Sequence, residues 1–146
     1  MKKYYPIPFN PSEFMTGSFD RSKLCSEWES IHSYLELLLT TCPGEHKFDK
    51  NWGCKIWERD FELITSANQW ESQCATIILE MIKNYEHRLD EVAVNVKIID
   101  VSKIDNDVLP KTVKRKMRIK IHAIFTSTGD ECDFEYNLYL GPIGSE

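Results

Sequence analysis

Apolar residues recur at steps of three and four between Ser22 and Thr41, a spacing that places side chains on one face of a helix. The repeating positions are Leu24, Trp28, Ile31, Leu35, Leu38 and Leu39. Pro43-Gly44 follows this stretch. Proline cannot continue a helix, and glycine readily adopts the backbone conformations of a helix end. The pattern therefore predicts one helix of about five turns over residues 22–41.

Two further segments show helical periodicity. The first is a shorter and less regular segment over residues 54–64, with apolar positions at Ile56, Trp57, Phe61 and Ile64. The second follows Ser66 or Asn68, either of which can cap a helix. Its apolar positions fit one helical face closely and are Trp70, Cys74, Ile77, Ile78, Met81, Ile82 and Tyr85. This segment predicts the most regular helix of the chain.

After Arg88 the apolar period changes from 3.6 to 2, which is the period of a strand. Residues 92–99, 113–125 and 132–140 all alternate in this way. A linker over residues 102–110 separates the first two strands, and a short turn joins the last two. The sequence thus predicts an α+β fold, in which N-terminal helices pack on one face of a three-stranded antiparallel sheet.

The turn Ser127-Thr128-Gly129-Asp130 predicts the register of the last two strands. Centring the turn between Thr128 and Gly129 places His122 opposite Glu135, with Lys120 diagonal to it. On the apolar face the expected pairs are Phe125 with Cys132, Ala123 with Phe134, Ile121 with Tyr136 and Ile119 with Leu138. The basic run over residues 111–120 forms a solvent-facing row beside an acidic row, or it docks on an acidic partner.

Residues 1–21 are predicted to form an N-terminal arm ahead of the domain. This segment contains three prolines, no helical period and the aromatic residues Tyr4, Tyr5, Phe9, Phe14 and Phe19. We expect an extended arm that packs either across its own domain or on a partner, because exposed apolar groups usually have a role. Residues 22–141 are expected to form a single domain, followed by a C-terminal tail at 142–146.

Composition narrows the class of protein. The chain has 146 residues, of which 42% are hydrophobic and 28% charged, and its net charge is -5. The negative charge argues against nucleic-acid binding, which needs a basic surface. No stretch approaches the ~20 apolar residues of a membrane span, and the N-terminus does not resemble a signal peptide. Five cysteines without framework spacing are typical of reduced thiols, so we expect a cytoplasmic protein without direct membrane insertion.

Candidate catalytic chemistry is sparse. The spacing of Cys42, His46 and Cys54 resembles part of a metal site, but tetrahedral zinc needs four ligands and no fourth is evident. No glycine-rich phosphate loop is present. Carboxylate pairs for glycoside hydrolysis arise by chance among 23 acidic residues, for example Glu45 with Asp49 or Glu58 with Asp60. We therefore predict no catalytic residue, metal, cofactor or small-molecule substrate.

Two motifs resemble those of the phage baseplate-wedge, lysozyme-like family, which includes TssE-like subunits of type VI secretion systems. The first runs from Thr41-Cys42-Pro43-Gly44-Glu45 to Trp52-Gly53 and is similar to the family's T-x-PGE and FG signature. The second, Glu86-His87-Arg88, resembles the family's E-P-R element at a helix-to-strand junction. The match covers about residues 22–140. The chain departs from the family pattern at Trp52 and His87, where phenylalanine and proline are common.

The resemblance implies a structural baseplate subunit of a contractile injection machine. Such a subunit joins baseplate wedge proteins (TssF/TssG-like) and presents a sheet edge on which sheath proteins begin to assemble by strand exchange. On this resemblance the partner-binding residues are Glu45, Glu86, His87 and Arg88. For Glu86 and Arg88 the alternative is an internal salt bridge that ties helix to sheet. The alternative functions are a regulatory protein-binding module of the same fold and a muramidase-like hydrolase.

Overall fold

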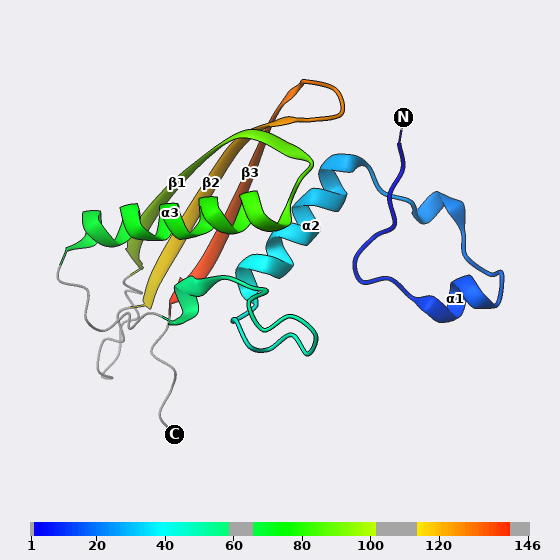
Figure 1. Cartoon of the computed structure of the whole chain (residues 1–146), viewed down its shortest axis with the longest axis horizontal. Helices are drawn as coiled ribbons and strands as arrows, with labels where there is room; N and C mark the ends of the chain where they lie inside the picture. Colours follow the sequence, from blue (N-terminus) through cyan, green and yellow to red (C-terminus); the bar gives the residue numbers. More distant parts are fainter. Residues whose placement is uncertain (1, 59–65, 102–113, 141–146) are drawn as a thin grey trace, which may run out of the picture.

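The computed structural model describes residues 2–58, 66–101 and 114–140 (Figure 1). The three strands form one antiparallel sheet in the order β1-β2-β3, so the predicted α+β architecture is confirmed. The predicted linker at 102–110, the tail at 142–146 and residues 59–64 of the second predicted helix lie outside the described residues. The elements are α1 (Pro11–Met15), η1 (Arg21–Lys23), α2 (Glu27–Thr40), η2 (Lys55–Glu58), α3 (Ala67–Tyr85), β1 (Leu89–Val101), β2 (Lys114–Phe125) and β3 (Glu131–Leu140).

Helix α2 begins later than the apolar pattern predicts. Ser26 is its N-cap and forms a capping box with Glu29, in which the Ser26 side chain accepts from the Glu29 N–H and the Glu29 carboxylate accepts from the Ser26 N–H. This arrangement satisfies two N–H groups at the helix start. The prediction that the helix starts at residue 22 is therefore wrong, because the backbone ahead of Ser26 forms η1 and a bridge from Cys25 to Tyr4.

The other two predicted helices differ in outcome. Helix α3 is the long regular helix that the sequence predicts, although the N-cap residue Ser66 makes no side-chain capping hydrogen bond. In the second predicted helix, the described residues 55–58 form a 3-10 helix, η2, rather than an α-helix. No helix in the described ranges has the length and apolar character needed to cross a membrane.

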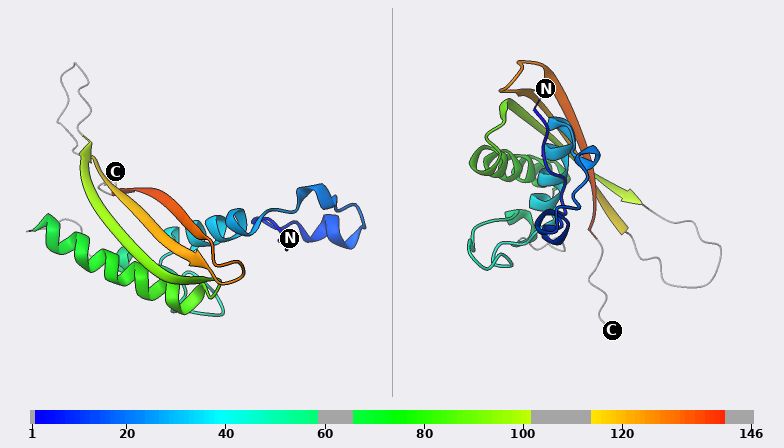
Figure 2. Two further views of the ribbon diagram at one scale, coloured as in Figure 1. Left: turned by 90° about the horizontal axis from the view of Figure 1, so that it is seen from above. Right: turned by 90° about the vertical axis from the view of Figure 1, so that its right-hand side faces the viewer.

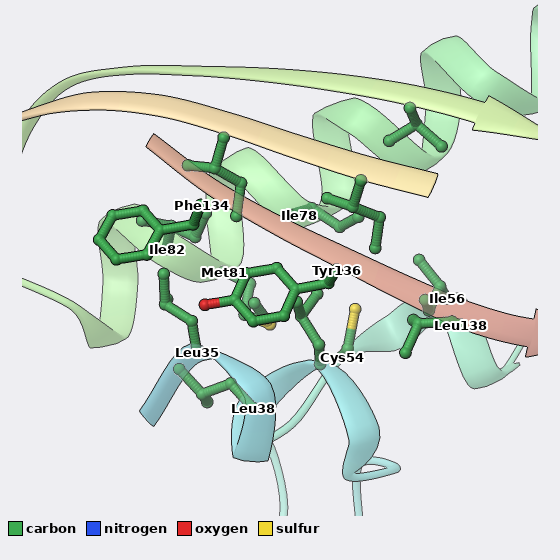
Figure 3. Packing of buried hydrophobic residues seen from close by; sticks show 14 of the residues in the cluster. Leu35, Leu38, Cys54, Ile56, Ile78, Met81, Ile82, Phe134, Tyr136 and Leu138 are labelled. Atoms are coloured by element: carbon green, nitrogen blue, oxygen red, sulfur yellow. The ribbon is translucent and has the colours of Figure 1, made fainter. Parts of the chain in front are cut away.

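The hydrophobic core lies between the sheet and helices α2 and α3 (Figure 3). Strand β3 alternates strictly between exposed and buried residues, so one face of the sheet is covered and the other is open. Cys54, in the loop before η2, and Ile56, within η2, are also fully buried. The fully buried residues from the two helices are Ile31, Leu35, Leu38, Leu39, Cys74, Ile78 and Ile82.

The predicted register of the β2–β3 hairpin is wrong by two residues. Ala123 lies opposite Cys132, and His122 lies opposite Asp133 rather than Glu135. The hairpin closes through a four-residue loop, in which the Phe125 N–H donates to the Asp130 carbonyl at 2.9 Å. A slip of two residues keeps every side chain on the same face, so the apolar pattern alone does not distinguish the two registers. The other apolar pairs are Ile121 with Phe134, Ile119 with Tyr136 and Met117 with Leu138.

The N-terminal arm is more structured than the sequence predicts. It contains the short helix α1 and extends from the N-terminal end of α2, away from the sheet (Figures 1 and 2). Four of its rings, Tyr5, Phe9, Phe14 and Phe19, contact one another with centroid separations of 5.5–6.5 Å. Tyr4 links the arm to the body through two backbone hydrogen bonds with Cys25. The arm therefore packs largely on itself.

Candidate functional site

The junction between α3 and β1 is organised around one buried carboxylate. Glu86 is 3% exposed, although it is charged. Its Oε1 accepts from Arg88 Nε at 2.8 Å and from the Arg88 backbone N–H at 3.0 Å, while its Oε2 accepts from Arg88 Nη2 at 2.7 Å. This two-pronged pairing is the strongest geometry available to a guanidinium and a carboxylate. The hydrogen bonds to Glu86 also raise the pKa of Arg88.

Arg88 also connects the junction to distant parts of the chain. Its Nη1 donates to Ser30 Oγ on α2 at 2.9 Å, and its guanidinium lies 5.3 Å from the ring centroid of Tyr4. The Tyr4 hydroxyl donates to Glu27 Oε1 at 3.2 Å, and Glu27 Oε2 accepts from the Ser127 hydroxyl at 2.6 Å. The arm, α2, the junction and the β2–β3 turn thus meet at one polar cluster.

His87 is the outward-facing member of the junction. Its side chain is exposed, and it has no hydrogen bond or ion pair with any described residue. It borders a hollow of about 380 Å³ that Lys83, Asp90 and Glu91 also line. Glu91 has a φ of 49° and lies within a break in the strand register between Asp90 and Ala93. A left-handed conformation costs a non-glycine residue about 1–2 kcal/mol, and such bulges often occur beside functional sites.

The loop between α2 and η2 contains the other motif. Its two ends meet where the Cys54 N–H donates to the Thr41 carbonyl at 2.9 Å. A Cβ on Gly53 would lie 2.7 Å from that carbonyl oxygen, and its φ of 129° is one that other residues rarely adopt. Only glycine fits there without distortion. Glu45 is exposed at the tip of the loop, where its carboxylate accepts from the Cys42 N–H at 3.3 Å.

The edge of the sheet at β3 carries unpaired backbone groups. The indole N–H of Trp28 donates to the Asp133 carbonyl at 3.1 Å, so the backbone of Asp133 faces outward. In an antiparallel pair, outward and inward residues alternate. Glu135, Asn137 and Tyr139 therefore also direct their N–H and C=O groups away from β2. No hydrogen bond in the described part of the chain uses these groups.

The described residues offer no clear catalytic or metal centre. No three His, Cys, Asp or Glu side chains among them are grouped so that they could hold a metal ion. Two residues of the metal-like spacing in the sequence, His46 and Cys54, lie in the following surroundings. His46 Nδ1 accepts from the Asp49 N–H at 3.1 Å, and burial raises the pKa of the Cys54 thiol to about 12. A groove of about 800 Å³ has Asp133 and Glu135 in its lining. Both are exposed and ion-paired, with His122 and Arg118, and neither has the apolar surroundings of a general acid.

A comparison with known families decides the class of the protein. The sequence model of the family described as baseplate wedge protein gp25 matches residues 26–130, from the cap of α2 to the β2–β3 turn. The chain belongs to this baseplate wedge family. Membership supports a structural role in a baseplate. No curated protein matches the chain.

Two solved structures share the baseplate wedge fold of this chain. One, described as a tail lysozyme from Geobacter sulfurreducens, is 19% identical with a TM-score of 0.59 and covers 83% of this chain and 97% of that chain. The other belongs to the baseplate complex from the type VI secretion system. It is 15% identical with a TM-score of 0.51 and covers 77% of this chain and 93% of that chain.

The structure of this baseplate wedge domain separates the four predicted partner-binding residues. Glu86 and Arg88 form the internal salt bridge, His87 faces solvent beside them, and Glu45 lies on another loop. No described contact joins Glu45 to the other three. Ser30, the one buried polar residue within the apolar stripe of α2, was not predicted from the sequence.

Two aromatic residues of the site were also missed. Tyr4 packs on Arg88, but the two residues are far apart in the sequence, and the periodicity of one helix or strand does not reveal such a contact. Trp28 was assigned to the apolar stripe of α2, but its side chain is 41% exposed and lies at the edge of the sheet.

Proposed function

We propose that the protein is a structural baseplate subunit of a contractile injection machine of the type VI secretion class, working in the cytoplasm. In this proposal it joins TssF/TssG-like wedge proteins and gives the sheath its first docking edge. The observation that carries the proposal is the family match over residues 26–130, which includes both motifs and the β1–β2 pair. The five free cysteines are consistent with a reducing compartment.

The junction supports contact with wedge proteins at His87 and Arg88. The Glu86 carboxylate is already engaged on both oxygens, so its part is to hold the guanidinium in place. Arg88 keeps 28% of its side chain exposed, and His87 projects beside it over the hollow. A partner can therefore reach a fixed planar cation and an imidazole on one surface, with Glu45 as a separate contact on the loop after α2.

The sheet edge supports sheath docking. A strand edge with free N–H and C=O groups can accept a strand from another chain by β-augmentation. On β3 the outward groups at Glu135, Asn137 and Tyr139 are available. Strand exchange at this edge extends the sheet of the subunit into the sheath.

Wedge binding is tested by co-purification of variants with TssF/TssG-like proteins. We expect His87→Ala, Arg88→Lys and Glu45→Gln each to lower recovery of the wedge proteins, because each changes a partner-facing group. In all three variants a positively charged side chain remains at position 88 to pair with Glu86. Glu80→Gln is the matched control, since Glu80 is exposed on α3. Wild-type recovery with all three variants, as folded proteins, contradicts the proposed wedge contact.

Sheath docking is tested by fluorescent-sheath foci in cells. Proline has no N–H, so Glu135→Pro and Asn137→Pro each remove one outward donor without removing a bond to β2. We expect both variants to be soluble and both to lose sheath foci, whereas Glu135→Ala and Asn137→Ala retain them. Normal foci with both proline variants exclude this edge as the docking site.

The competing functions predict other results. A muramidase-like hydrolase releases sugar from cell walls, and a single carboxylate substitution abolishes that release. A regulatory module binds one partner tightly in the absence of any wedge protein. We expect no sugar release from the purified protein, because Asp133 and Glu135 in the groove of about 800 Å³ are exposed and ion-paired. We expect no tight partner outside the baseplate, because the family match is to a baseplate wedge protein.

A further inference from the structure

We propose that the strand accepted by β3 carries a lysine or arginine, flanked by apolar residues, in the row of side chains that faces α2. The basic residue pairs with Glu36. This inference rests on the proposed strand addition at the β3 edge and specifies the chemistry of the strand that fits there.

The two edges of the sheet are not equivalent. At the β1 edge, Glu71 on α3 reaches across, so that its Oε1 accepts from the Ile98 N–H at 2.9 Å and its Oε2 lies 3.6 Å from Lys97 Nζ. Side chains that cover an edge in this way prevent unwanted strand pairing. At the β3 edge, Trp28 covers only the Asp133 carbonyl. The free segment from Glu135 to Tyr139 accommodates a strand of about five residues.

A groove of about 260 Å³ lies between this free segment and the C-terminal half of α2. Its described lining is His32, Glu36, Leu39 and Thr40 from the helix and residues 135–138 from the strand. No lysine or arginine is among these residues. An added strand places alternate side chains over this groove, on the same side of the sheet as Tyr136.

Glu36 gives the groove an uncompensated negative charge. It is exposed, and it forms no ion pair with any residue of the described ranges. Burial of Tyr136 is the main cause of its raised pKa, and the negative charge of Glu36 is the second cause. Glu36 therefore lies close to the strand. On the open face of the sheet the acidic residues do have partners. Glu135 Oε1 lies 3.5 Å from Arg118 Nε, and Asp133 Oδ1 lies 2.7 Å from His122 Nδ1.

The occupant follows from this charge distribution. The row of an added strand that faces the groove meets Leu39, Tyr136 and Leu138, which favour apolar side chains. The same row meets Glu36, which favours a cation. A pair formed beside the added strand is more shielded from water than an ordinary surface pair and gives specificity as well as affinity.

The test uses the full-length protein and two synthetic seven-residue peptides, Thr-Val-Thr-Lys-Thr-Val-Thr and the same peptide with Glu in place of Lys. Binding is followed by NMR on isotope-labelled protein. We expect the Lys peptide to bind at least about tenfold tighter than the Glu peptide. Its chemical-shift changes should centre on Glu135, Asn137 and Tyr139.

A charge reversal provides the matched variants. In Glu36→Lys we expect the preference to reverse toward the Glu peptide, whereas Glu80→Lys, the same change at an exposed position of α3, should leave it unchanged. Equal affinity for the two peptides, or no shift at the β3 edge at millimolar Lys peptide, overturns the inference.

A cell experiment separates this inference from the proposed function. Glu36→Lys should reduce sheath foci, and Glu80→Lys should not. Normal foci in Glu36→Lys cells, combined with loss of foci in the Asn137→Pro cells, overturn the inference and leave sheath docking at this edge intact. Normal foci in the proline variants instead overturn the docking itself.

Discussion

Replacing Arg88 with alanine is expected to destabilise the protein by about 3–5 kcal/mol, because the substitution leaves a buried carboxylate without its counter-ion. Glu86 is 3% exposed, and its two oxygens accept from Arg88 at 2.8 and 2.7 Å. A pair of exposed ions contributes about 1 kcal/mol or less. The expected loss is a large part of the roughly 5–15 kcal/mol that holds a typical domain together.

A second substitution separates the cost of the orphaned charge from the cost of lost packing. In the double variant Glu86→Gln/Arg88→Ala the buried group is neutral, so we expect it to recover about 1–3 kcal/mol relative to Arg88→Ala. Arg88→Lys keeps the positive charge but loses the planar fork and should fall between the wild type and Arg88→Ala.

The measurement is urea unfolding at neutral pH, followed by circular dichroism, with the slopes of the transitions compared to confirm that each variant unfolds from a similar native state. A loss below about 1 kcal/mol for Arg88→Ala shows that Glu86 reaches water and that the pair behaves as a surface pair. A double variant no more stable than Arg88→Ala likewise contradicts the reasoning.

Four further predictions concern the loop after α2, the β2–β3 turn, the β3 edge and the open sheet face. Gly53→Ala should cost about 3 kcal/mol or more in urea unfolding, because it combines an unfavourable φ of 129° with a clash. Gly129→Ala, with a φ of 78° and open space around it, should cost about 1–2 kcal/mol. Trp28→Phe keeps an aromatic ring but loses the hydrogen bond to Asp133, and should cost about 1 kcal/mol. The hydrogen bond that the His122 imidazole donates to Asp133 raises the pKa of His122, so this pair stabilises the fold most below the ordinary pKa of 6.5 and less as the pH rises through the raised value. Asp133→Asn should remove this part of the pH dependence in unfolding experiments between pH 5 and about 8.

Much of the fold could be predicted from the sequence, because the spacing of apolar residues within one segment indicates whether that segment is a helix or a strand. Helix α3 and the three strands each bury one continuous face, and a face repeats at a fixed interval along the chain. The start of α2 was predicted too early because Leu24 fits the apolar period of the helix. The capping box at Ser26 instead makes the helix begin after that residue. The register of the hairpin was wrong because a shift of two residues leaves both faces intact. Turn geometry therefore decides the register.

The candidate site was harder to predict, because its residues meet across the fold. Motif resemblance identified Glu86 and Arg88 but not their burial, which depends on how α2 packs against the junction. The bond from Arg88 to Ser30 joins residues 58 positions apart, and the bond from Trp28 to Asp133 joins residues 105 positions apart. No periodicity within one element carries such information.

The side chains at the two sheet edges have a consequence for the subunit before it is assembled. A free three-stranded sheet has two edges, and exposed edges promote aggregation of identical chains. Glu71 occupies a donor on β1, and Trp28 occupies an acceptor on β3. Before assembly, the subunit therefore exposes fewer free N–H and C=O groups through which identical chains could pair. We expect Glu71→Ala to lower the concentration at which the purified protein precipitates, since it frees the Ile98 N–H and removes a negative charge.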